Sequence, residues 1–289
     1  MEKVQGKIEE GGVREELKIK TETMYAIQKL RIQAQLRIKA FVRDERLTKK
    51  RSEAMHHWLE ELLKDTENLV GHDVGDLLKG IPIWNVFMKH VLGLGPRLAG
   101  SIVAGIYDIS RFNHVSSLWK YCGQDVTADG EAPRRQSGQK ISWNPFLRMT
   151  IYKITDSMVK QNADKSLYRR LYDQKKAFYQ KKFPEWAVCR TCGAKLIAMK
   201  GEFDKCSNIE CKGKSGGIKH PTRKDRKGNP IYIHTKGHIH KMAKRYTGKI
   251  FLQHLWMMWR RLEGLPENMP WIIEHGGHVD FIPPEEAMV

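Results

Sequence analysis

Four of the five cysteines are arranged in two close pairs, a pattern typical of the ligands of a structural zinc ion. Cys189 and Cys192 form a C-x2-C pair within CRTCG, and after thirteen residues Cys206 and Cys211 form a C-x4-C pair. Four thiolates close the tetrahedral coordination of Zn²⁺ and leave no open position for catalysis. The sequence therefore predicts a structural zinc ribbon. Because the second spacing is wider than the commonest one, His220 is an alternative ligand.

Lysines surround the predicted ribbon, and more basic residues follow it. Such a surface fits contacts to phosphate groups, although a merely solvated charged surface produces the same pattern. The candidate phosphate contacts after the ribbon are Arg223, Lys224, Arg226 and Lys227. The fifth cysteine, Cys122, stands alone in the sequence and is expected to be a small buried residue.

Ser137 lies in the segment PRRQSGQK, where its hydroxyl group stands among cationic side chains. A serine hydroxyl is a weak nucleophile until a base, a metal ion or adjacent cations activate it. Arg134, Arg135 and Lys140 are expected to clamp a phosphate group beside it. No His–Asp pair is near in sequence, while His114 stays open as a spatial neighbour. Taken alone, these residues indicate an ordinary turn serine.

A second candidate phosphate site lies in the segment VLGLGPRLAGSIVAGI at positions 91–106. Its pattern is that of a helix-hairpin-helix, in which Gly93 and Gly95 permit a tight turn. The backbone amides at the N-terminus of the following helix face outward, and Pro96 suits its first turn. We expect Gly93, Gly95 and Arg97 to contact phosphate. The alternative is an ordinary glycine-containing helical turn.

These candidate sites need helices to position them, and the longest predicted helical region covers residues 17–64. Apolar residues form one stripe there, and a shorter apolar stripe follows near its end. One long helix or two stacked helices fit the pattern, and two interpretations stay open: a coiled coil with a second chain, or packing within its own domain. The stripes are Ile27, Leu30, Ala34, Ile38 and Phe41, and then Met55, Leu59, Leu62 and Leu63.

The fold class predicted for the whole chain is mainly α-helical. We expect a flexible tail over 1–16 and a coiled-coil-like segment over 17–70. A helical domain containing the hairpin is expected over 71–182 and 236–263, interrupted by the ribbon insert at 183–235. A helix should follow the turn at Asn144 and Pro145, and the helix over 236–262 should be basic early and apolar late. Residues 264–289 are expected to form a Pro-rich tail.

Charge narrows the classes of partner. The chain has 51 Lys and Arg against 33 Asp and Glu, a net charge of +18. Residues 190–249 hold 16 basic and 4 acidic residues, so about two-thirds of this excess lies in one region. Such a surface suits nucleic acid first and an anionic membrane surface second. Neither a signal peptide nor a membrane-spanning helix is expected, which indicates an intracellular protein associated with the cytoplasm or nucleoid.

The segment from Val91 to Arg148 resembles the transposase domain of the IS one-ten family of insertion sequences. The resemblance follows LGLGPRLAGSIVAGIYDISRF, KYCGQDV, PRRQSGQK and NPFLR in that order. It resumes after the insert in KMAKRYTGKIFLQHLWMMWRR, and about half of the chain is covered. The resemblance implies a helical transposase domain that binds DNA, with Arg148 among the candidate contacts. It also implies Ser137 as the nucleophile, self-association, and a guide RNA as a further partner.

Two departures from the family qualify these expectations. The family carries a RuvC-like nuclease domain that holds two Mg²⁺ ions through acidic residues, and no such domain is visible here. Mg²⁺ is therefore expected only with a RuvC-like partner, and Zn²⁺ is expected as a structural ion in an insert that the family lacks. Three functions stay open: a transposase-type DNA-binding protein that needs a nuclease domain supplied elsewhere, a stand-alone serine recombinase, and a structural or regulatory nucleic-acid-binding protein.

Overall fold

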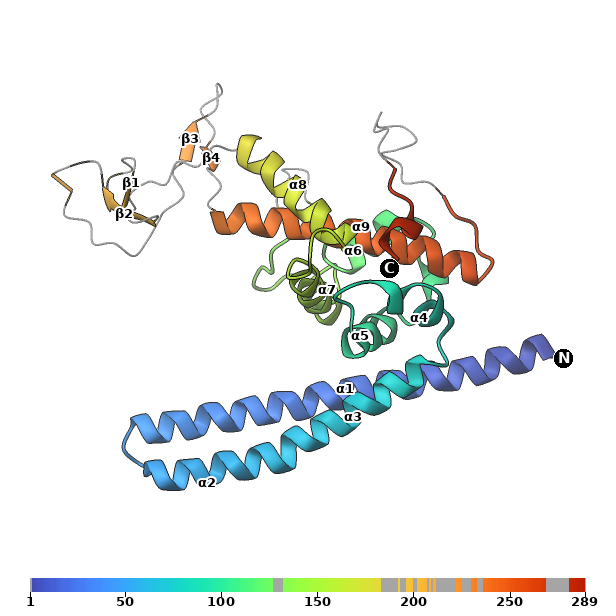
Figure 1. The fold of residues 1–289 in the computed structure, drawn as a ribbon, viewed down its shortest axis with the longest axis horizontal. Coiled ribbons are helices and arrows are strands. Elements are labelled where there is room, and N and C mark those ends of the chain that lie inside the picture. The colour runs from blue at the N-terminus through green and yellow to red at the C-terminus, as the bar shows by residue number, and fades with distance from the viewer. Residues whose placement is uncertain are drawn as a thin grey trace. The chain divides into compact units, whose positions relative to one another are not determined.

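The computed structural model describes residues 2–126, 132–182, 192, 196–199, 202–206, 208, 210–211, 222–224, 230–232, 236–268 and 281–288. For residues 2–11 and for the four short strands it describes the backbone alone. The described chain is mainly α-helical with a long N-terminal helix, as predicted (Figure 1). It forms two compact units: unit 1 comprises Met1–Leu167 and Gly248–Val289, and unit 2 comprises Tyr168–Thr247.

The N-terminal part of unit 1 is an antiparallel helical hairpin. Helix α1 (Glu2–Arg43) is followed by α2 (Lys49–Leu59), a π-helical turn η1 (Glu60–Lys64) and α3 (Asp65–Leu78). The Thr48 hydroxyl accepts a hydrogen bond from the backbone N–H of Arg51 and so caps α2. Polar pairs join the two arms, among them Gln35 with Glu60 and Lys20 with Asp73. The region therefore packs within its own chain.

The π-helical turn keeps one face of the second arm against α1. The buried positions Ser52 and Leu59 are seven residues apart, and so are Glu67 and Val74. Leu59 and Glu67 are separated by eight residues, one more than this repeat. A π turn absorbs one extra residue, so η1 restores the register of the buried face.

The predicted apolar stripe of α1 is not the face that packs on the second arm. Of its five members only Ile38 is buried, whereas Leu30 is 51% and Phe41 43% exposed. Polar residues occupy interface positions instead, because Gln28 and Arg31 form hydrogen bonds with Glu67 across the hairpin. Hydrophobicity alone therefore does not identify the face of α1 that packs on the second arm.

The N-terminal end is helical where the sequence predicts a flexible tail, and the predicted Pro-rich C-terminal tail contains a short helix. Helix α1 already begins at Glu2, and Leu17 within it is completely buried. At the other end, the 3-10 helix η4 (Pro284–Ala287) packs through the buried Pro284 and Ala287. Long-range contacts fix these segments, and local composition does not reveal such contacts.

The body of unit 1 is built from short helices around the second half of the last long helix. The elements are α4 (Pro82–Val86), η2 (Met88–His90), α5 (Pro96–Ile106), η3 (Ile109–Arg111), α6 (Val115–Tyr121), α7 (Pro145–Met158) and α9 (Lys236–Leu262). Every residue from 251 to 260 of α9 is buried. The indole N–H of Trp256 donates to the Phe112 carbonyl at 2.7 Å. The predicted apolar late part of this helix is confirmed as core.

Unit 2 contains α8 (Leu167–Lys182) from Tyr168 onward, α9 up to Thr247, and two small β-hairpins. Strand β1 (Leu196–Met199) pairs antiparallel with β2 (Glu202–Cys206), and β3 (Thr222–Lys224) pairs antiparallel with β4 (Pro230–Tyr232). These strands lie in the predicted insert. None of the helices in the described part of the chain is both long and apolar enough to cross a bilayer.

Candidate nucleic-acid interface

Ser137 lies at the exposed apex of a tight turn. The Gln139 amide donates to the Gln136 carbonyl at 3.3 Å, and Gly138 has φ +74°. Since Ser137 itself does not have a positive φ, this is a type II turn, whose third position favours glycine. Among the described residues, none forms a hydrogen bond with the Ser137 hydroxyl, so no described His or carboxylate acts as its base.

Cations surround this turn as the sequence predicts. Arg134, Arg135 and Lys140 are all exposed. Residues 135–140 line an open hollow of about 630 Å³ at the turn. The arrangement offers a phosphate group two kinds of contact: positive charge from the flanking side chains, and the Ser137 hydroxyl at the apex.

Arg148 supports the turn rather than extending from the surface toward a ligand. Its Nη1 donates to the Pro133 carbonyl at 2.9 Å, and its guanidinium lies 4.8 Å from the centre of the Trp143 ring. A Cβ at Gly123 would lie 2.9 Å from the Arg148 Cδ, so this side chain needs the glycine. The predicted phosphate contact is therefore a residue that positions the loop.

Asn144 joins the loop to α7. Its Oδ1 accepts hydrogen bonds from the Phe146 and Leu147 amides, which caps the N-terminus of the helix. The backbone N–H of Asn144 donates to the Tyr121 carbonyl at 2.8 Å. The predicted turn at Asn144 and Pro145 is confirmed as the start of a helix, and it fixes the end of the Ser137 loop.

The predicted hairpin is present at the start of α5, but its two glycines have different roles. Gly95 is the N-cap residue, is exposed, and has open space around the position of a Cβ. Gly93 has φ +89°, and a Cβ there would lie 3.2 Å from the Met158 Cα. Gly93 thus permits close packing on α7. Pro96 has no N–H, and the Leu98 and Ala99 amides donate to the Gly95 carbonyl, so in this first turn of α5 the Arg97 amide is the donor left for an anion.

Arg97 has partners within the protein. Its Nη2 donates to the Asn68 side chain at 2.9 Å, and Nη1 lies 3.6 Å from a Glu67 carboxylate oxygen. The guanidinium covers Gly71 of α3, where a Cβ would lie 2.6 Å from Nε. Since the side chain is 43% exposed, a phosphate group at Gly95 can still approach it. Arg97 therefore links the hairpin turn to the helical arm.

The Ser137 loop and the Gly95 turn do not converge on one point. The loop precedes the N-terminus of α7, while Gly93 packs on Met158 at its C-terminus. The fourteen residues of α7 span ~21 Å.

The described parts of the insert include a β-hairpin that ends at Cys206, the first member of the predicted second cysteine pair. The β1–β2 register places Leu196 opposite Cys206, so the backbone of Cys206 lies across from the chain that follows Cys192. Asn208 then forms a turn, because its carbonyl accepts from the Cys211 amide at 3.1 Å. Cys192 is exposed and Cys211 is half-buried. This donor set suits Zn²⁺, but Cys189 and His220 lie outside the described residues.

The remaining candidate cations of the insert are only partly described. Arg223 and Lys224 belong to β3, for which the backbone alone is described, while Arg226 and Lys227 lie outside the described residues.

Cys122 is completely buried, as expected, and burial raises the pKa of its thiol far above the ordinary value. It is therefore an inert core residue.

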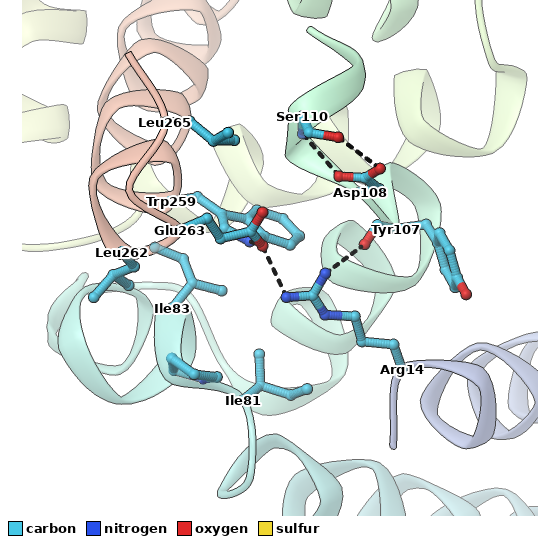
Figure 2. A pocket seen from close by; sticks show the side chains of 11 residues that line it. Arg14, Ile81, Ile83, Tyr107, Asp108, Ser110, Trp259, Leu262, Glu263 and Leu265 are labelled. Atoms are coloured by element: carbon cyan, nitrogen blue, oxygen red, sulfur yellow. Dashed lines mark hydrogen bonds and ion pairs between the residues drawn. The ribbon is translucent and has the colours of Figure 1, made fainter. Parts of the chain in front are cut away.

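A separate cavity of about 560 Å³ lies where α1, α5 and α9 meet (Figure 2). Arg14 points from α1 toward Glu263, at 2.8 Å, and toward the Tyr107 carbonyl, at 3.4 Å. The Trp259 indole donates to the same Glu263 oxygen. The charged residues that line the cavity are one cation, Arg14, and two carboxylates, Asp108 and Glu263, so its negative charge disfavours a phosphate group, and it is best described as a structural junction.

The cations of α8 are further candidate contacts to phosphate groups, and they lie before the basic region that was predicted from residue 190 onward. The segment RRLYDQKKAFYQKK alternates basic and aromatic residues, which is the sequence signal that could have identified them.

No protein-family model matches the chain, and no curated protein is significantly similar to it.

Proposed function

We propose that the chain is a DNA-binding protein of the transposase type, taking part in DNA transposition or recombination. The observation that carries the proposal is the exposed turn with Ser137 at its apex and Arg134, Arg135 and Lys140 beside it. Such a turn presents a hydroxyl group and positive charge to the same phosphate. The resemblance of the surrounding segments to IS one-ten transposases supports this proposal independently of the geometry.

In the proposed reaction the Ser137 Oγ attacks a DNA phosphorus atom, loses its proton, and displaces a sugar oxygen. The flanking cations would offset the negative charge that develops on the phosphate. Neither effect removes the serine proton, and no described residue is hydrogen-bonded to the hydroxyl. We therefore propose that a RuvC-like domain with Mg²⁺, supplied elsewhere, completes the site. This favours the dependent transposase over a recombinase that uses Ser137 alone.

A covalent protein–DNA adduct tests the role of the serine. The wild-type chain and Ser137→Ala should both bind DNA, and neither should give an adduct on a denaturing gel. Addition of a RuvC-like partner in trans, with Mg²⁺, should produce an adduct with the wild type only. Adduct formation by the isolated wild type would instead support the stand-alone recombinase, and an adduct with Ser137→Ala would remove the serine from the chemistry.

A structural or regulatory nucleic-acid-binding protein is the second candidate. The specific observation in its favour is that the Ser137 hydroxyl has no base among the described residues. DNA binding without any adduct, even when the partner and Mg²⁺ are present, would favour it.

A further inference from the structure

We infer that the α8 and α9 helices of unit 2 form a surface that binds an unpaired nucleic-acid strand by stacking bases on aromatic rings. The surface is defined by Lys175, Phe178 and Tyr179 of α8 and Tyr246 of α9. This inference rests on the proposed nucleic-acid binding and identifies a contact surface separate from the Ser137 loop.

Three aromatic rings from the two helices gather around one ammonium group. The Lys175 Nζ lies 4.6 Å from the centre of the Phe178 ring, 4.5 Å from that of Tyr246 and 5.5 Å from that of Tyr179. Distances below about 6 Å are those of cation–π interactions. Lys175, Phe178 and Tyr179 are spaced i, i+3 and i+4, so they share one face of α8. The cation is therefore held beside the rings before any ligand arrives.

The rings are accessible to a ligand. Phe178 is 50% exposed, although it is a large apolar side chain, and Tyr179 and Tyr246 are half-buried. The rings of Phe178 and Tyr179 lie 5.6 Å apart at an interplanar angle of 64°, a T-shaped contact in which an edge of one ring meets one face of the other. A planar base can thus stack on Phe178 while its phosphates lie near Lys175.

Charge complementarity identifies the partner as a polyanion. Residues 168–182 hold six Lys or Arg and one acidic residue, Asp173, which pairs with Arg169 at 2.7 Å. Residues 236–247 of α9 hold four Lys or Arg and no acidic residue. Exposed cations on the same two helices include Arg170, Lys181 and Lys241. This composition excludes a basic partner and favours phosphate groups.

The aromatic faces distinguish an unpaired strand from a duplex. In a duplex both faces of each base are covered by neighbouring base pairs, so only phosphates and groove edges are accessible. Exposed rings next to cations are the arrangement by which single strands are bound with little sequence preference. An acidic protein segment would satisfy the cations, but it does not present a planar ring at every residue as a nucleic-acid strand does. The surface therefore fits DNA or RNA strands with accessible bases.

The test compares binding of single strands and duplexes by the full-length protein. The probes are labelled oligothymidine and oligouridine of about twenty nucleotides, longer than the roughly 4–16 nucleotides that one single-strand-binding fold covers. A duplex of the same length is the third probe. Phe178→Ala should weaken binding of a single strand roughly fivefold or more, as expected for one lost base stack. Duplex binding should change by less than about twofold, a difference too small for a lost contact.

Two variants separate stacking from other effects. Phe178→Tyr keeps the ring and should restore affinity, whereas Leu69→Ala removes an exposed apolar side chain of α3 and should leave affinity unchanged. The relative affinity of oligothymidine and oligouridine shows whether DNA or RNA is preferred.

Several outcomes would overturn the inference. One is an equal loss on duplex and single strand in Phe178→Ala, and another is no loss on either. Displacement of the strand by polyglutamate as effective as by unlabelled strand would assign the surface to an acidic protein. If the wild type bound no nucleic acid at all, the proposed function would fail together with this inference. If only the Phe178 effect were missing, the proposed function would stand.

Discussion

At the scale of single residues, positively charged side chains divide between ligand contact and internal support. Arg97 and Arg148 were both expected to contact phosphate, yet each donates hydrogen bonds to its own chain. Their partners, Asn68 and Pro133, are 29 and 15 residues away in sequence. A sequence pattern identifies a basic residue, but an internal partner at such a distance depends on the tertiary fold. Net charge therefore overstates the number of cations available to DNA.

Arg135 and Arg148 should respond differently to truncation. Arg135→Ala should lower DNA affinity and reduce the slope of log affinity against log salt by about 1, with unchanged thermal stability, because it removes an exposed phosphate contact. Arg148→Ala should lower the free energy of unfolding by about 1–3 kcal/mol, since the Pro133 carbonyl loses its partner. Salt-dependent binding and urea unfolding of both variants provide the measurement. Identical behaviour of the two variants would contradict the division of roles.

His254 should make stability depend on pH. It is completely buried, and burial lowers its pKa from 6.5 to about 4, more than its hydrogen bond to the Ile282 carbonyl raises it. The unfolded chain therefore binds a proton below about pH 6.5 that the folded chain does not bind. Stability is complete above that pH and should fall by roughly 3 kcal/mol as the pH decreases toward 4.

Urea unfolding at several pH values between about 7 and 5 measures this effect. His254→Gln should reduce the dependence on pH in that window while lowering stability overall, because the titrating group is gone. An equally steep dependence in the variant would show that other groups cause it.

At the scale of elements, the sequence predicted the helices better than their faces. The glycine turn before α5, the start of α7 at Asn144 and the apolar end of α9 follow from local rules, and the structure confirms each of them. The buried face of α1 does not follow from such rules, because the half-buried Gln28 and Arg31 lie at the interface by pairing with the buried Glu67. The π turn η1 could not be predicted from the sequence either, because its role is to adjust the register of the second arm against α1.

Glu67 should be the most sensitive position of the helical hairpin. Its side chain is only 4% exposed and accepts hydrogen bonds from Gln28 and from two nitrogen atoms of Arg31. Glu67→Gln keeps the volume but leaves the Arg31 charge without a counterion in a largely buried place. Removal of one partner of a buried ion pair costs about 3–5 kcal/mol. Urea unfolding should show a loss of this size.

The matched control for this prediction is Glu61→Gln. Glu61 forms an exposed pair with His57 on the same arm, and its loss should have no measurable effect on stability. Equal stability of both variants would mean that the Glu67 network contributes nothing to the hairpin.

Zinc binding is a prediction for the insert as an element. Metal analysis of the purified chain should return one zinc ion per molecule, held by Cys189, Cys192, Cys206 and Cys211. Cys189→Ser should release it and loosen the insert, while the helical signal of unit 1 should persist because its core contains none of these residues. Full retention of zinc by a Cys189→Ser/Cys206→Ser double variant would contradict the ligand set. If zinc were lost from His220→Ala but kept by the cysteine variants, His220 would be identified as the alternative ligand.

At the scale of the whole molecule, residues of both units carry the proposed contacts. Within unit 1, the Ser137 loop and the Gly95 turn lie at opposite ends of α7, and in unit 2 the rings and cations of α8 and α9 form another surface. Separate phosphate contacts add to affinity and make it steeply dependent on salt.

Self-association is the remaining property expected of the whole molecule, and the helical hairpin offers a surface for it. Near the hairpin tip, Phe41 of α1 and Met55, Trp58 and Leu62 of the second arm are each 43–54% exposed. Gln35 pairs with Glu60, so Phe41 lies near the level of Met55, and helical periodicity places these side chains on one side of the hairpin. A cluster of exposed large apolar residues favours burial against a second chain.

Sedimentation of the intact protein at about 10⁻⁵ M should therefore show a dimer or a larger species, which requires an association free energy of at least roughly −7 kcal/mol. Trp58→Glu should shift the protein to the monomer, because a charge in an apolar interface would be buried without a partner. Leu69→Glu, at an exposed position of α3 outside the cluster, should leave the association unchanged. A monomeric wild type at this concentration would contradict the prediction. Equal dissociation of both variants would show that the association does not depend on the hairpin tip.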